Sequence, residues 1–166
     1  MSAHTPAFSV AVQGITGRCP AGEAYANEQI GKKTFPVLSC EGPCIRGEIA
    51  RLAANLVASE MPELARSCHA EAFYVPHSAM RAWLEQAEKI IMMDGCFLKC
   101  HGRVLNNLVP AEKVIHFDVL PFHKKFMDGF LMEDYPEAER KAVARQVADK
   151  IIAKLKQEFL ETTAGA

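Results

Sequence analysis

Two pairs of cysteines, each with three residues between its members, are the part of this sequence best suited to chemistry. Cys40 and Cys44 form the first pair, and Cys96 and Cys100 form the second. Each pair stands where an apolar segment gives way to a helical pattern, so we expect the first cysteine at a helix start and the second about one turn inside. Backbone N–H groups and the helix dipole favour the thiolate there. Four converging thiolates suit zinc, an iron–sulfur cluster or Cu(I).

The remaining cysteines leave other interpretations open. The chain has six cysteines, of which the other two are Cys19 and Cys68. Without a recognisable secretion signal, this number favours metal or redox chemistry over a disulfide framework. Free cysteine is also one of the most buried residue types, so purely structural thiols are the alternative. His101 is a further candidate ligand, and an exposed helical histidine is its plainer interpretation.

Composition predicts a single ordinary domain, residues 1–166, in the cytoplasm. Of its 166 residues 49% are hydrophobic, which is ample for a core, and 19 basic residues are balanced by 20 acidic ones. This balance gives no reason to expect nucleic acid or an anionic membrane as a partner. We divide the chain into an N-terminal extension (1–33), a core (34–120) and a C-terminal helix (134–160).

Strand and helix patterns alternate along the chain. Predicted strands are 7–14, 34–40, 71–75, 89–94 and 113–119, and predicted helices are 43–60, 78–87, about 97–107 and 136–160. Alternation of this kind predicts an α/β three-layer sandwich, with a mostly parallel sheet of four or five strands and helices on both faces. The last helix carries one apolar stripe, Val147, Ile151, Leu155 and Phe159, which we assign to the core, with contact to a second copy in a homodimer as the alternative.

The topology predicts that the two cysteine pairs meet. Cys40 ends one predicted strand and Cys96 follows another. In open parallel sheets, sites form outside the carboxyl ends of the strands, so both pairs belong to the same edge. Asp94 is expected to cap the next helix and Gly95 to permit a tight turn. The segment 118–136 leaves the same edge and could cover the site.

The stretch "MMDGC", followed by three residues and Cys100, resembles the small DGC-domain proteins, which are described as zinc-binding through four chelating cysteines. "VLSCEG" and the following "ARLAAN" resemble the first cysteine motif of that family, and the likeness spans about residues 35–120. The resemblance implies Cys40, Cys68, Cys96 and Cys100 as ligands, whereas spacing favours Cys44 over Cys68. The resemblance implies a zinc site with a role in metal handling, metal sensing or structure, and it implies no enzymatic activity.

The stretch "CEGPCIR" supports a second interpretation. Its C-x5-R spacing between a strand and a helix resembles the phosphate loop of low-molecular-weight tyrosine phosphatases and arsenate reductases. That resemblance implies a thiol-dependent enzyme with Cys40 as nucleophile and Arg46 holding an oxyanion. Two residues depart from the pattern of that loop. Gly47 stands where those enzymes place Ser or Thr, and Pro43 has no backbone N–H to donate to an anion.

Overall fold

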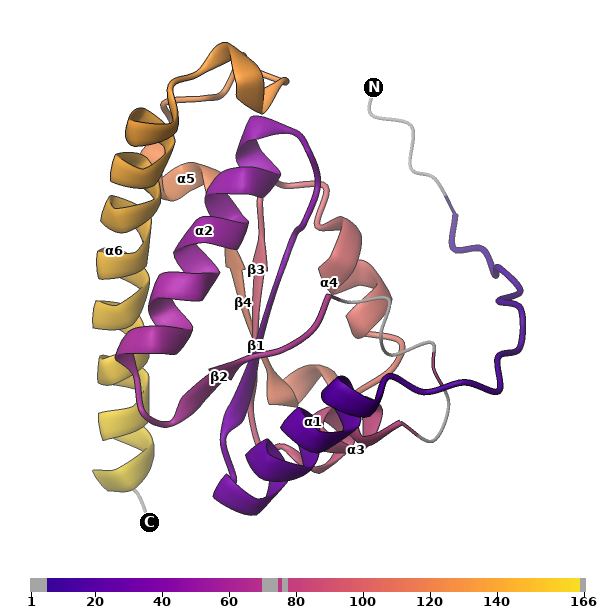
Figure 1. Cartoon of the computed structure of the whole chain (residues 1–166). Helices are drawn as coiled ribbons and strands as arrows, with labels where there is room; N and C mark the ends of the chain where they lie inside the picture. The colour runs from indigo at the N-terminus through magenta and orange to yellow at the C-terminus, as the bar shows by residue number, and fades with distance from the viewer. Residues whose placement is uncertain (1–5, 70–74, 76–77, 165–166) are drawn as a thin grey trace.

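A parallel sheet of four strands in the order β2-β1-β3-β4 forms the centre of the computed structural model, which describes residues 6–69, 75 and 78–164 (Figure 1). The strands are β1 (Phe35–Ser39), β2 (Leu64–Arg66), β3 (Ile90–Asp94) and β4 (Val114–Asp118). The α-helices are α1 (Pro20–Lys32), α2 (Ile45–Glu60), α3 (Ala79–Gln86), α4 (Cys100–Leu105), α5 (Leu120–His123) and α6 (Glu137–Ala164), with short 3-10 helices at Ala111–Lys113 and Met132–Asp134. The α/β prediction is confirmed.

Helices cover both faces of the sheet, which makes three layers. Helices α2 and α6 lie on one face, and α1, α3 and α4 lie on the other (Figure 1). Successive strand residues point to opposite faces, so Ile91 and Met93 enter the core with α2 and α6, while Ile90 and Met92 pack against α3 and α4. All five residues of β3 are buried, which explains its continuous apolar sequence.

Helix α6 packs along α2, and its predicted stripe is part of the core. Val147, Ile151 and Leu155 are fully buried, and Phe159 packs against the same cluster. The stripe is therefore occupied within the chain and is not available to a second copy. None of the helices in the described part of the chain is long and apolar enough to cross a membrane.

Several predicted elements differ from those observed. Residues 7–14 are exposed and irregular, because their alternating apolar pattern has no neighbouring strand to pair with. The predicted strand 71–75 falls outside the described residues, apart from Val75. Helix α1 was not predicted, although Pro20 at its first position and the Cys19 side chain at its N-cap both signal a helix start. The short strand β2 was also missed.

Truncation of the α6 stripe should destabilise the fold measurably. We expect Ile151→Ala to lower the free energy of unfolding by about 2–5 kcal/mol, because it leaves a cavity at a fully buried position. Urea denaturation followed by circular dichroism measures this. The exposed Lys156 on the same helix provides the control, since Lys156→Ala should change stability by less than about 0.5 kcal/mol. Equal effects of both changes would contradict the assigned packing.

Candidate thiol site at the carboxyl edge of the sheet

The loop between β1 and α2 carries the first cysteine pair and is held by backbone hydrogen bonds at both ends. The Cys40 N–H donates to the Met93 carbonyl at 2.9 Å, which extends the pairing of β1 with β3 by one residue. At the other end, the Ile45 N–H donates to the Phe130 carbonyl at 2.7 Å, and Cys44 forms a β-bridge with Leu131. The segment before α6 thus lies against this loop.

Each helix begins at the second cysteine of its pair, not at the first. Cys44 is the N-cap of α2, and its Sγ accepts a hydrogen bond from the Gly47 N–H at 3.3 Å. Cys100 is the first residue of α4, after Lys99 with a φ of 49°. The prediction that the second cysteine lies one turn inside the helix is therefore wrong. The three residues between the cysteines form turns instead of a first helical turn.

The turn that follows β3 is pressed against the start of α2. A β-carbon on Gly95 would lie 2.6 Å from the Arg46 carbonyl oxygen and 2.8 Å from the Gly47 nitrogen, so only glycine allows this approach. A β-carbon on Gly47 would in turn lie 3.1 Å from Cys40 Sγ. The Cys40 sulfur and the turn that leads to Cys96 therefore meet at the same point of α2.

The Asp94 carboxylate organises the start of α4, as its predicted capping role requires. It is buried and accepts hydrogen bonds from the His101 N–H at 3.3 Å and the Gly102 N–H at 3.0 Å. Its Oδ2 also lies 2.8 Å from Nε2 of His116, on strand β4. Sequence reasoning did not select His116. A signal was available in the sequence, because Asp118 pairs with Asp94 in the parallel register of β3 and β4 and His116 stands two residues before Asp118.

The surroundings of Cys100 disfavour its thiolate and raise the pKa of the thiol. Partial burial raises the pKa of the Cys100 thiol, and the nearby Cys40, Cys96 and Asp94 raise it further, while Arg103 acts in the opposite direction. Burial and neighbouring negative groups therefore act against the thiolate that the helix start is predicted to favour. The interactions with Cys40 and Cys96 also indicate that the three thiols share one electrostatic neighbourhood.

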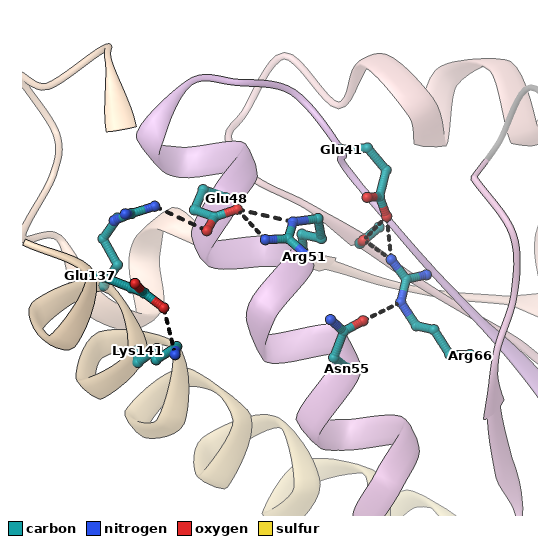
Figure 2. Close-up of polar contacts among 9 residues, drawn as sticks. Glu41, Glu48, Arg51, Asn55, Arg66, Glu137 and Lys141 are labelled. Atoms are coloured by element: carbon teal, nitrogen blue, oxygen red, sulfur yellow. Dashed lines mark hydrogen bonds and ion pairs between the residues drawn. The ribbon is translucent and has the colours of Figure 1, made fainter. Parts of the chain in front are cut away.

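Two polar networks, one around Arg66 and one around Glu48, connect the elements next to the thiols (Figure 2). Arg66, on β2, donates to the Val37 carbonyl at 2.8 Å and forms an ion pair with Glu41, the residue after Cys40. Burial lowers the pKa of Arg66, and Glu41 opposes that shift. On the opposite side of α2, the buried Glu48 carboxylate accepts from Arg51 at 2.7 Å and from Arg140 of α6 at 3.2 Å.

The five candidate cysteines follow three neighbouring strands, with Cys40 and Cys44 after the middle one of the three. Cys40 and Cys44 both flank Gly42, since a β-carbon there would lie 3.9 Å from either sulfur. Cys68 is exposed beyond the end of β2, which is separated from β3 by β1. All six cysteines are free. Within the described residues, no group of three or more His, Cys, Asp or Glu side chains stands at positions that could hold a metal ion.

A family model for the DGC domain matches residues 36–147. The chain belongs to the DGC-domain family. The match includes all five candidate cysteines and extends beyond the predicted range of 35–120 into α6. Membership fits a metal-binding protein, whereas no curated protein and no solved structure matches this chain.

Closing the space at Gly95 should separate the two loops. We expect Gly95→Ala to lower the free energy of unfolding by about 1–3 kcal/mol, because the new methyl group would overlap the backbone of Arg46 and Gly47. Chemical denaturation measures this loss, and alkylation rates should show the Cys96 thiol becoming more accessible. Gly14→Ala is the matched control, since nothing lies within 4 Å of that position. A neutral Gly95→Ala would contradict the close packing.

Proposed function

We propose that this DGC-domain protein is a cytoplasmic zinc-binding protein whose Cys40, Cys96 and Cys100 thiolates are ligands at the carboxyl edge of the sheet. The role of such a site is metal handling, metal sensing or structural stabilisation. The observation that carries the proposal is the packing of Gly95 on the start of α2, since it sets the Cys40 sulfur beside the turn that presents Cys96. A thiolate-only donor set suits tetrahedral zinc.

Cys44 is the better of the two candidates for the fourth ligand. The sulfur atoms of Cys44 and Cys40 both lie next to Gly42. The Cys44 sulfur also caps α2, the helix against which Gly95 packs. Cys68 follows a strand on the far side of β1 and is the fourth cysteine that the family resemblance implies. Geometry therefore favours Cys44, and single substitutions distinguish the two.

Binding would require the thiols to turn toward one another and to lose their protons. Rotation about χ1 carries a cysteine sulfur between staggered positions without moving the backbone. The raised pKa of Cys100 means that metal must displace a proton from this thiol, so affinity should increase with pH. Arg46, Lys99 and Arg103 lie in or beside the two loops and would offset the negative charge of a four-thiolate zinc site.

Removal of the second cysteine pair should abolish zinc binding. We expect the anaerobically purified protein to carry about one zinc per chain, and the double variant Cys96→Ser, Cys100→Ser to carry less than about a tenth of that. Elemental analysis measures the metal, and cobalt(II) substitution reports thiolate ligation through charge-transfer absorption.

Matched single variants complete this experiment. Cys19→Ser should keep its zinc, because Cys19 is the N-cap of α1 and lies outside the matched DGC region. Cys44→Ser should lose more affinity than Cys68→Ser if Cys44 is the fourth ligand, and the reverse result would identify Cys68. Stoichiometric zinc in the double variant would refute the assignment of Cys96 and Cys100.

A thiol-dependent enzyme with Cys40 as nucleophile is the second candidate. One observation favours it. Arg46 Nε is buried and has no hydrogen-bond partner within the described structure, so it could donate a hydrogen bond to a bound oxyanion. Other observations oppose it, because the Ile45 and Gly47 N–H groups are already engaged and Pro43 has none. A phosphate cradle needs such donors to be unoccupied.

Alkylation separates this candidate from zinc binding. If Cys40 were an activated nucleophile, iodoacetamide would modify it first, and arsenate or phosphate would protect it. From the engaged amides we expect no protection by either anion in the metal-free protein. Mass spectrometry of the peptide that contains Cys40 measures this, with Cys19 as the internal reference. Selective protection, together with phosphatase or arsenate reductase turnover, would establish the enzyme instead.

A further inference from the structure

Five large apolar side chains are exposed around the thiol edge, and we refer to them as the apolar rim. They are Phe97, Leu98, Met127, Phe130 and Leu131, and their exposed fractions range from 50% to 69%. Single exposed apolar residues are common on soluble proteins, but a contiguous group marks an interaction surface. Neither the packing of the core nor the proposed zinc site uses these side chains.

The rim residues lie at the same end of the molecule. Phe130 and Leu131 are tied to the start of α2 through the Ile45 hydrogen bond and the Cys44 bridge. Phe97 and Leu98 directly follow the Gly95 turn, which packs on that helix start. In Figure 1 the segment before α6 and the β3–α4 connection flank the first turn of α2. The rim therefore has two halves, one on each side of α2.

Basic residues border one half of the rim, and acidic residues outnumber basic ones beside the other. Next to Phe97 and Leu98, the α4 side exposes Lys99 and Arg103. The other half lies among the exposed Asp128, Glu133 and Asp134. Lys124 and Lys125 precede that half, and Lys125 forms an ion pair with Glu139 at 2.7 Å.

From this arrangement we propose that the apolar rim is the contact surface for a second copy of this chain in a symmetric dimer. A two-fold axis places Phe97 and Leu98 of each copy against Met127, Phe130 and Leu131 of the other. The basic border of each copy then meets the acidic border of the other, once on each side of the axis. A two-fold interface must be self-complementary, and an apolar centre between borders of opposite charge satisfies that condition. This inference goes beyond the proposed zinc binding and does not require it.

The apolar centre is tested by one substitution at an exposed position. We expect the purified protein to be a dimer in analytical ultracentrifugation, and Phe130→Glu to weaken dimerisation by about tenfold or more. Val10→Glu, at a similarly exposed apolar residue in the N-terminal segment, should leave the dimer intact. A wild-type protein that stays monomeric at its highest soluble concentration would overturn the proposal. A dimer lost only with Val10→Glu would overturn it too and would identify the N-terminal segment as the contact.

Charge reversal tests the two-fold arrangement itself. One variant carries Lys99→Glu and Arg103→Glu, and the other carries Asp128→Lys and Asp134→Lys. Each variant alone should be monomeric, since like charges then face each other across the interface, whereas an equal mixture should dimerise. A mixture that stays monomeric, or single variants that still dimerise, would refute this geometry. Zinc content measured on the Asp128→Lys, Asp134→Lys variant separates this result from the zinc proposal, since this variant keeps all the cysteines and the cations beside them.

Discussion

The close approach of the Asp94–Gly95 turn to the first residues of α2 is the contact on which the thiol edge depends. Parallel pairing of β1 with β3 brings the two loops to the same level, but only the missing side chain of Gly95 lets their backbones meet. Because a β-carbon on Gly47 would also crowd the Gly42 carbonyl oxygen and the Cys40 sulfur, the two glycines together determine how near Cys40 lies to the turn that carries Cys96. A site built this way is sensitive to one methyl group.

Asp94 links that contact to the rest of the edge. Lys99 stands at the N-cap of α4 without a side-chain hydrogen bond to the helix, and the Asp94 carboxylate supplies the missing acceptor from the end of β3. The same carboxylate holds His116 on β4. It also adds to the rise in the pKa of Cys100 that burial chiefly causes. Helix position, sheet edge and thiol protonation are therefore coupled through one buried group.

Ion pairs tie both α2 and the loop before it to neighbouring elements. Glu48 connects α2 to α6 through Arg140, and Arg66 connects the loop of Glu41 to β2. These contacts are partly buried, so removing one partner would leave a polar group without compensation. They hold the start of α2 in place, between the cysteine loops and the segment that carries Phe130. The cysteine loops and the apolar rim therefore both pack on the start of α2.

Sequence by itself determined the layered α/β fold, the strands near 34–40 and 89–94, and the common edge for Cys40 and Cys96, because apolar runs and helical periodicity report burial directly. Only the tertiary structure decided that 7–14 is not a strand, since strand formation needs a partner that no local pattern reveals. Tertiary structure also raised the Cys100 pKa, because burial and nearby charges act on that thiol, and it placed the Asp94 carboxylate at the end of β3 where it caps the helix that begins at Cys100.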